Sequence, residues 1–168
     1  MKMTEILSNR KALLISSAFL SIISILLVLH ILKPEAQLLL VDDSKDEMIQ
    51  SIELDDGNFF SLTYTHSVEK SEVKEVFEVR GQDIYVMESY TESFGAGLPY
   101  EGTVLESDDG KYAIKDINQK LDNLIVRPSK LYPHYLTYGN EEILISDYPF
   151  QGKNIRIVVN ERGENFER

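Results

Sequence analysis

The sequence contains no cysteine among its 168 residues. This absence excludes disulfide bonds, a thiolate nucleophile, zinc sites with cysteine ligands and the acylated cysteine of a lipoprotein. A folded domain of this chain must therefore owe its stability to packing.

Motifs for cofactors and metals are also lacking. No G-x-x-x-x-G-K-[ST] phosphate loop and no G-x-S-x-G nucleophile elbow occurs, so Ser67 has no sequence context for nucleophilic catalysis. A zinc site would need His66, His134 and a carboxylate such as Glu69 or Glu75, and no spacing motif supports one. We therefore expect no cofactor and no metal, and we assign no catalytic residue.

Positive charge is scarce. From Pro34 onward the chain carries 27 Asp and Glu against 13 Lys and Arg, which gives a formal charge of −14. This balance argues against binding nucleic acid or anionic lipid through a general electrostatic field. An acidic surface of this kind is more typical of solubility or salt adaptation than of a binding site.

One long hydrophobic run is present near the N-terminus. Residues 12–32 carry no formal charge and are dominated by Leu, Ile, Val, Ala and Phe. As a helix, these 21 residues would span about 30 Å, the thickness of one hydrocarbon core. The run predicts a transmembrane signal-anchor helix that places residues 12–32 in the lipid bilayer.

The flanks of this run predict its orientation. Lys2, Arg10 and Lys11 precede it, and only Lys33 follows before an acidic stretch. Because cytoplasmic flanks carry the excess of Lys and Arg, we expect a single-pass protein of the cell membrane with residues 1–11 in the cytoplasm.

The rest of the chain is then predicted to be an extracytoplasmic domain over residues 34–160, extracellular or periplasmic, with a flexible tail over 161–168. The competing interpretation is a cleaved signal peptide, whose hydrophobic region normally has about 7–15 residues. The run here is longer, and Pro34-Glu35-Ala36 is a poor cleavage site. Both features favour an uncleaved anchor.

The outer domain has the pattern of an all-β protein. Past Pro34 no stretch keeps a helical period for three turns, whereas β-branched and aromatic residues recur in short runs between Gly, Asp, Asn and Pro. This pattern predicts a compact antiparallel β-sandwich or a partly open barrel. The expected strands cover residues 37–41, 48–54, 58–66, 73–80, 83–90, 111–116, 121–127, 134–138, 142–146 and 154–159.

A first hairpin is expected around Gly57. A three-residue loop from Asp56 to Asn58 would pair Leu54 with Phe60 and Ile52 with Leu62, which keeps the apolar side chains on one face. Gly57 or Asn58 would then supply the positive φ that the loop needs.

A second hairpin carries two ionisable side chains on faces that the neighbouring apolar residues mark as buried. With a loop from Ser67 to Glu72, His66 would pair with Val73 and Tyr64 with Glu75. Glu75 would then lie diagonal to His66, close enough for a cluster with the Tyr64 hydroxyl.

Two interpretations of this cluster stay open. It could be a ligand-binding or proton-handling site, or a structural polar cluster whose hydrogen bonds are satisfied internally, as most buried polar groups are. Of the other candidates, Arg127 is expected to be half-buried at most and able to pair with an acidic neighbour. His134 is expected to be a strand-edge residue without a role.

A shaped loop follows the strand expected over residues 83–90. The segment 91–102 contains three glycines and a proline among aromatic residues. Its backbone N–H groups could line an anion or carboxylate pocket, as successive amides in turns can.

Two motifs resemble a known family. They are Tyr64-Thr65-His66-Ser67-Val68-Glu69-Lys70 followed by Val73-x-Glu75-x-Phe77, and Ser93-Phe94-Gly95-Ala96-Gly97-Leu98-Pro99. Over about residues 58–160 the chain is similar to an uncharacterised prokaryotic family, domain of unknown function 1850.

The resemblance implies a context and no chemistry. Members of the family are typically short, secreted or anchored at the membrane, and they resemble partners of tripartite TRAP-type transporters of the TAXI class, beside which they are often encoded. No activity is established for the family. By residue match, the resemblance implies a shared site formed by His66, Ser67, Glu69, Glu75, Gly95 and Gly97. Tyr64 and Phe94 lie in the same two motifs and are added as candidate binding residues.

Three functional hypotheses follow. The first is an accessory module that binds a TRAP-type transporter subunit or a small solute, which could be anionic, near His66 and Gly95. The second is an enzyme of the hydrolase type that uses His66 as base with Glu75 orienting it. The third is a structural envelope protein. We favour the first, and thus recognition over catalysis.

Overall fold

The computed structural model describes residues 19–25, 36–54, 57–93, 101–106 and 110–161. The chain divides into two compact units, Met1–Pro34 and Glu35–Arg168. In the first unit, residues 19–25 are helical, and the Ser24 hydroxyl donates to the Leu20 carbonyl at 2.9 Å. No helix within the described residues has the length and apolar character needed to span a membrane. Most of the anchor predicted over 12–32 lies outside the described residues.

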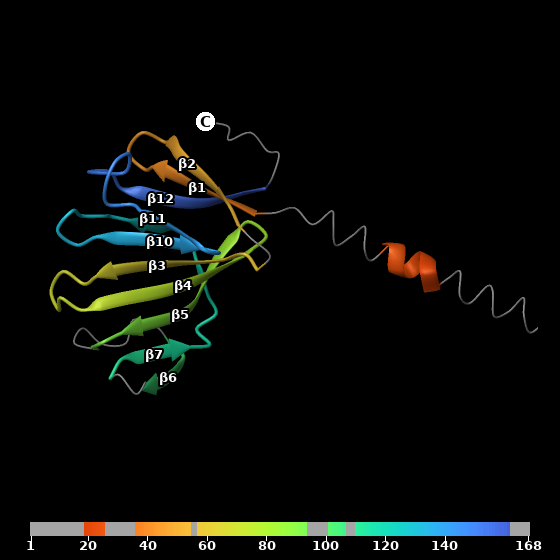
Figure 1. Cartoon of the computed structure of the whole chain (residues 1–168), viewed down its shortest axis with the longest axis horizontal. Helices are drawn as coiled ribbons and strands as arrows, with labels where there is room; N and C mark the ends of the chain where they lie inside the picture. The colour runs from red at the N-terminus through yellow and green to blue at the C-terminus, as the bar shows by residue number, and fades with distance from the viewer. Residues whose placement is uncertain (1–18, 26–35, 55–56, 94–100, 107–109, 162–168) are drawn as a thin grey trace, which may run out of the picture. The chain divides into compact units, whose positions relative to one another are not determined.

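The described part of the second unit is built of β-strands. Figure 1 labels most of them. In chain order they are β1 (Ala36–Asp42), β2 (Glu47–Glu53), β3 (Phe59–Thr65), β4 (Glu72–Arg80), β5 (Asp83–Thr91), β6 (Thr103–Glu106), β7 (Tyr112–Lys115), β8 (Gln119–Leu121), β9 (Leu124–Val126), β10 (His134–Tyr138), β11 (Glu141–Leu144) and β12 (Ile155–Glu161).

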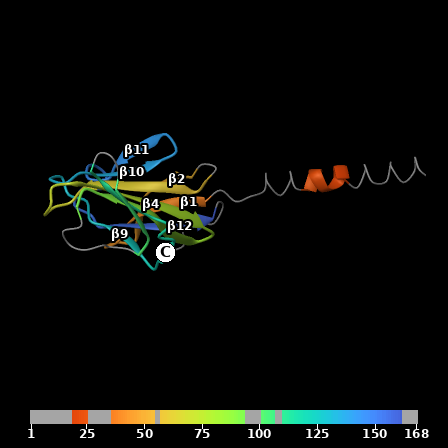
Figure 2. The ribbon, with the colours of Figure 1, turned by 90° about the horizontal axis from the view of Figure 1, so that it is seen from below.

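These strands form two antiparallel sheets. The smaller sheet has the order β2-β1-β12-β9, and the larger has the order β11-β10-β3-β4-β5-β7-β6, with β8 paired to β5. In Figure 1, β3 and β4 run along the horizontal direction, and the loop that joins them lies at one end of both strands. Figure 2 shows the same ribbon from below. The prediction of an all-β antiparallel sandwich is confirmed.

The core lies between the two sheets. The alternation of apolar residues along the central strands, such as β4 and β5, gives each of them one buried face. Phe60 of β3 pairs with Phe77 of β4, and their rings stack with centroids 5.0 Å apart. From the smaller sheet, Leu38, Leu40 and Ile155 pack into the same cluster, each fully buried.

The hairpin predicted around Gly57 is wrong. Ile52 of β2 pairs with Leu38 of β1, whereas Phe60 belongs to the other sheet. The segment crosses from one sheet to the other, so its apolar residues share the core without pairing. Gly57 or Asn58 was predicted to have a positive φ, and Asn58 has one of 52°. The Asn58 carbonyl accepts a hydrogen bond from the Val79 N–H at 2.8 Å.

Two other strand predictions need correction. The strand predicted over 121–127 is two strands: β8 pairs with β5 in the larger sheet, and β9 pairs with β12 in the smaller one. The polar pair Asp122-Asn123 occupies the crossing between them. The short strand β6 was not predicted, and all four of its residues are exposed.

Candidate functional site

The β3–β4 hairpin carries the centre of the predicted site. In its ladder, Tyr64 lies opposite Val73, and Leu62 lies opposite Glu75. The predicted register, with His66 opposite Val73 and Tyr64 opposite Glu75, is therefore wrong by two residues. Because the error is an even number of residues, each side chain still lies on its predicted face.

The loop explains the shift. The backbone N–H of His66 donates to the Ser71 carbonyl at 2.8 Å, and the His66 carbonyl accepts from the Lys70 N–H at 2.9 Å. The Nδ1 atom of His66 also accepts a hydrogen bond from the Glu69 N–H at 3.2 Å. Lys70 completes the turn with a φ of 60°. The loop therefore begins at His66 and not at Ser67, and the imidazole stabilises it from within.

His66 is thereby separated from Glu75. Glu75 lies opposite Leu62, and His66 is four residues beyond Leu62, a separation of about 13 Å at ~3.3 Å per residue. A hydrogen bond between the two side chains needs donor and acceptor within about 3.2 Å. The hydrolase hypothesis, in which Glu75 orients His66, has no support in this geometry.

A cavity of about 350 Å³ opens between the two sheets beside Tyr64. Ligand sites usually have volumes of about 300–1,000 Å³, so this cavity suits a small solute. Strands β3, β4 and β10 form one side, and β9 with the residue after it forms the other. The lining residues are Leu62, Tyr64, Glu75, Leu124, Ile125, Val126, Arg127 and His134.

A stacked aromatic pair forms one wall of this Tyr64 cavity. His134 of β10 pairs with Tyr64 of β3, and their rings lie nearly parallel with centroids 5.1 Å apart. The His134 Nδ1 atom lies 2.7 Å from the Tyr132 carbonyl, and since a carbonyl only accepts, Nδ1 carries the proton. The other ring nitrogen, Nε2, is then an acceptor in the neutral imidazole. The main-chain N–H of His134 donates to the Ser146 hydroxyl at 2.7 Å, which fixes the start of the strand.

Burial sets the protonation of this pair. Burial lowers the pKa of His134, partly opposed by its hydrogen bond to the Tyr132 carbonyl. Burial also raises the pKa of Tyr64, and the nearby Glu75 carboxylate adds to that shift. At neutral pH the cavity wall therefore presents a phenolic O–H donor beside a neutral imidazole.

Two charged groups complete the lining. Glu75 is half-buried on β4, between Leu62 of β3 and Ser89 of β5 in the ladder. Arg127 follows β9, is exposed, and forms no ion pair within the described part of the chain. The cavity thus combines one carboxylate and one guanidinium with an aliphatic floor. No group of three or more acidic, His or Cys side chains suited to a metal ion occurs among the described residues.

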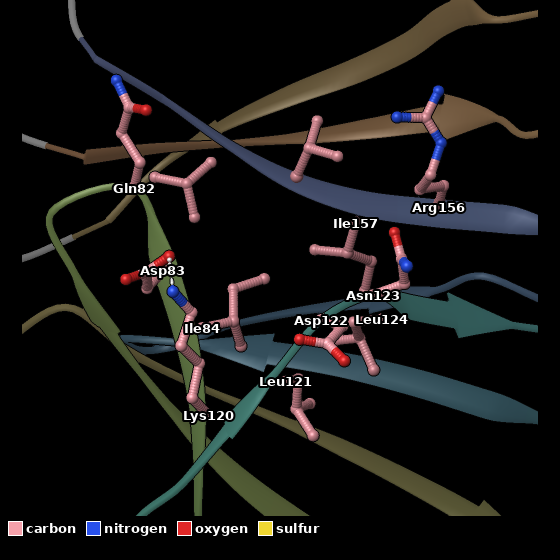
Figure 3. A pocket seen from close by; sticks show the side chains of 12 residues that line it. Gln82, Asp83, Ile84, Lys120, Leu121, Asp122, Asn123, Leu124, Arg156 and Ile157 are labelled. Carbon is pink, nitrogen blue, oxygen red and sulfur yellow. Dashed lines mark ion pairs between the residues drawn. The ribbon is translucent and has the colours of Figure 1, made fainter.

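A second cavity, also of about 350 Å³, lies among β5, β8, β9 and β12 (Figure 3). Lys120 and Asp83 form an ion pair at 2.9 Å on one wall. On another wall, Arg156 is paired with Asp43 and Asp46. Both cations of this cavity therefore already have anionic partners.

The family comparison covers the centre of the larger sheet. The family model described as Domain of unknown function (DUF1850) matches residues 60–145, which is half of the 168-residue chain. The chain belongs to this family. No curated protein and no solved structure matches this DUF1850 member. The resemblance seen in its two motifs is confirmed.

The family segment distinguishes the two cavities. All residues that line the Tyr64 cavity lie within residues 60–145. The second cavity takes part of its lining, Arg156 to Val159, from outside that segment. The Tyr64 cavity is therefore the better candidate for a site common to DUF1850 proteins.

The predicted site residues have three different outcomes. Tyr64 and Glu75 line the cavity. His66, Ser67 and Glu69 lie instead in the loop between β3 and β4, where Ser67 is exposed and the other two are half-buried. The last group lies outside the described residues: Phe94, Gly95 and Gly97.

His134 and Arg127 were missed as site residues. His134 shares the parity of Leu136, which is fully buried, so the imidazole starts on the apolar face of its strand. The same parity argument singled out Glu75, and applied here it would have found His134. For Arg127 we find no comparable local signal, because its place at the cavity depends on β9 crossing to the smaller sheet.

Proposed function

We propose that this DUF1850 chain is a membrane-anchored, extracytoplasmic accessory module that binds a small solute in the Tyr64 cavity and works beside a transporter. The observation that supports solute binding is the cavity itself. It joins a stacked Tyr64–His134 pair, a carboxylate and a guanidinium around an aliphatic floor. A pocket that joins apolar residues with a few convergent polar groups is typical of small-molecule sites.

The lining suggests the chemical class of the solute. Glu75 can accept hydrogen bonds from an ammonium group, and the Arg127 guanidinium suits a carboxylate. Leu62 and Leu124 line the same cavity and suit a small apolar body. We therefore favour a zwitterion of amino-acid type over a purely anionic solute.

The N-terminal sequence supports the anchor and the location. The uncharged run over residues 12–32 has the length of one hydrocarbon core, and the basic residues before it favour a cytoplasmic N-terminus. Cell fractionation tests this: the full chain of 19.2 kDa should stay with the membrane fraction. A mature band about 3 to 4 kDa shorter would instead indicate a cleaved signal peptide.

The transporter association is supported by the family resemblance. A TRAP-type transporter subunit encoded beside the gene should co-purify with the anchored chain. Co-purification that survives removal of residues 34–168 would show that the outer domain is not responsible.

Ligand binding is tested by thermal unfolding of the full chain in neutral detergent. The probes are apolar amino acids, dicarboxylates, alkyl amines and neutral sugars, each at millimolar concentration. We expect only amino acids to raise the melting temperature, because of these probes only they offer both an ammonium group for Glu75 and a carboxylate for Arg127. A ligand at 100 times its Kd stabilises the folded state by about 2.7 kcal/mol. Glu75→Gln and Arg127→Gln should each weaken the effect about tenfold or more, since each leaves one charge of the ligand without its partner.

The matched control is Lys120→Gln in the second cavity. It removes a cation from a cavity of the same volume and should leave the amino-acid effect unchanged. The proposal fails if no probe class shifts the melting temperature, or if Lys120→Gln removes the shift as fully as Arg127→Gln does.

A further inference from the structure

The two sheets line the Tyr64 cavity in different ways. Successive side chains of a strand point to opposite faces of its sheet, so a cavity on a face is lined by alternate residues. The larger sheet follows this rule, since β3 contributes Leu62 and Tyr64 but not Thr63. β9 and the residue after it contribute four consecutive residues, 124–127. Because residues of both parities line the cavity, β9 meets it with an edge of the strand.

This edge is the one that β12 does not occupy. β9 lies at the end of the smaller sheet and is paired with β12 along Leu124, Ile125 and Val126. β12 contributes no residue to the lining of the Tyr64 cavity. The cavity therefore borders the other edge of β9, where alternate residues direct their N–H and C=O groups away from β12. Within the described part of the chain, no backbone hydrogen bond reaches that edge.

β9 also lacks the usual protection of an edge strand. Natural sheets guard their edges with charged side chains, which discourage pairing with another chain. Every other edge strand among the described residues carries at least one charge. These charged residues are Glu47 and Glu53 of β2, Glu106 of β6, Lys120 of β8, and Glu141 and Glu142 of β11. β9 carries none, and its Ile125 is 41% exposed. The edge beside the cavity is thus open to one more strand.

An added strand would cover a part of the larger sheet that is only half covered. On the inner face of that sheet Leu62 is buried, whereas Tyr64, Glu75 and His134 are half-buried. Alternate side chains of a strand paired with β9 would face this surface and pack on Leu62 and on the Tyr64 ring. In this mode of peptide recognition, main-chain hydrogen bonds to a sheet edge give affinity and side-chain pockets give specificity.

Length and charge indicate a short peptide with free ends. Residues 124–127 span about 10 Å at ~3.3 Å per residue, which matches about two or three extended residues. Glu75 suits the ammonium group at one end of a peptide, and Arg127 suits the carboxylate at the other. An internal segment of a longer protein chain would bring neither charge to these two side chains.

We propose that the solute of the Tyr64 cavity is a peptide of about two or three residues, bound as an extra strand along the open edge of β9. The inference rests on the proposed function, because it specifies the ligand of the same site. It adds recognition of the ligand's main chain to recognition of its two charged ends. A single amino acid offers the charges without a peptide group, so a peptide binds more tightly.

The first test compares alanine with trialanine by thermal unfolding of the full chain in neutral detergent. We expect trialanine to reach the same rise in melting temperature at about tenfold lower concentration, because it adds main-chain hydrogen bonds to β9. Trialanine should also protect amides within residues 124–127 from hydrogen exchange. The control is β6, an edge strand away from the cavity, whose exchange should not change.

The second test uses two trialanines that each carry one methyl group on an amide nitrogen, that of the second or that of the third residue. Consecutive N–H groups of an extended chain point to opposite sides, so only one of the two can face β9. One isomer should therefore bind about tenfold or more weakly than trialanine, and the other should bind as trialanine does. Each isomer is the matched control of the other.

Other outcomes overturn the inference. If alanine and trialanine stabilise the chain equally, the inference fails and the proposed function stands. If neither stabilises it, the proposed function fails too. A trialanine with blocked ends that binds as tightly as the free peptide would show that the cavity takes a segment of a longer protein chain. Equal binding of the two methylated isomers would show that no strand forms along β9.

Discussion

His134 shows most clearly how one residue couples the fold to the site. Its ring stacks on Tyr64 inside the cavity, and its Nδ1 proton is held by the Tyr132 carbonyl. This arrangement keeps the imidazole neutral, because burial disfavours the charged form and lowers its pKa. The residue therefore acts both as a wall of the cavity and as a group whose protonation affects stability.

A pH dependence of stability follows. In the unfolded chain His134 titrates near pH 6.5, and in the folded domain it titrates lower. Below about pH 6.5 the unfolded state binds more protons, so the stability present above that pH is lost as the pH falls toward the folded pKa. We expect the melting temperature to fall between pH 7 and pH 5 more steeply for the natural chain than for His134→Gln.

The comparison of slopes makes this test specific. His134→Gln also removes the ring stacking on Tyr64, so its melting temperature should be lower at every pH. Only the slope reports the titration. Equal slopes for both proteins would show that His134 does not titrate differently in the folded state.

Among the elements, strand positions were predictable and strand partners were not. The alternation of apolar and polar residues has the period of a strand, so every predicted strand overlaps an observed one. That same alternation cannot say whether Ile52 and Phe60 lie side by side or face each other across the core. The split of the segment 121–127 was missed for a related reason, since only the partner strands reveal the change of sheet at Asp122.

Strand β6 was missed because it has no buried face. Its residues Thr103 to Glu106 are all exposed, and among the described strands it pairs with β7 alone. Gly102, directly before it, allows the pairing. A Cβ atom at Gly102 would lie 2.5 Å from the Lys115 carbonyl oxygen and 2.9 Å from Cγ2 of Ile114.

Gly102→Ala should therefore detach this edge strand. Because the closest atom belongs to the backbone of β7, the clash is relieved only by moving β6 away, at a cost of about 1–3 kcal/mol. Hydrogen exchange should show loss of protection in residues 103–106 while β3 and β4 keep theirs. The matched control is Gly57→Ala, whose Cβ would meet only the Phe59 side chain at 3.4 Å. Protection of β6 that survives in Gly102→Ala would contradict the expectation.

At the scale of the whole domain, the site combines near and distant parts of the chain. Tyr64 and Glu75 lie on neighbouring strands of one hairpin, and parity along those strands was enough to place both on the same face. Arg127 and His134 come from a segment some 50 to 70 residues later, brought in by β9 and β10. Sequence reasoning placed Tyr64 and Glu75, and the same parity argument could have placed His134. Arg127 depends on long-range pairing of β9 that leaves no local pattern.

The charge of the domain predicts how its stability depends on salt. A formal charge of −14 from Pro34 onward repels itself in the compact state. The ion pairs oppose this effect, but most are exposed, such as Lys130–Asp147, and exposed pairs contribute only about 0–1 kcal/mol each. We therefore expect the repulsion between the excess negative charges to outweigh the attraction within the ion pairs. We expect the melting temperature to rise as NaCl increases from about 10 to about 150 mM, where the screening length falls from ~30 to ~8 Å.

A charge-neutralised variant separates this effect from general effects of salt. Glu106 and Glu142 are exposed and form no ion pair within the described residues. The double variant Glu106→Gln/Glu142→Gln should be more stable than the natural chain at low salt and should gain less from added NaCl. A melting temperature that falls with salt would mean that attractive pairs outweigh the repulsion. The acidic surface would then stabilise the fold through its ion pairs, and its excess of negative charge would carry little energetic cost.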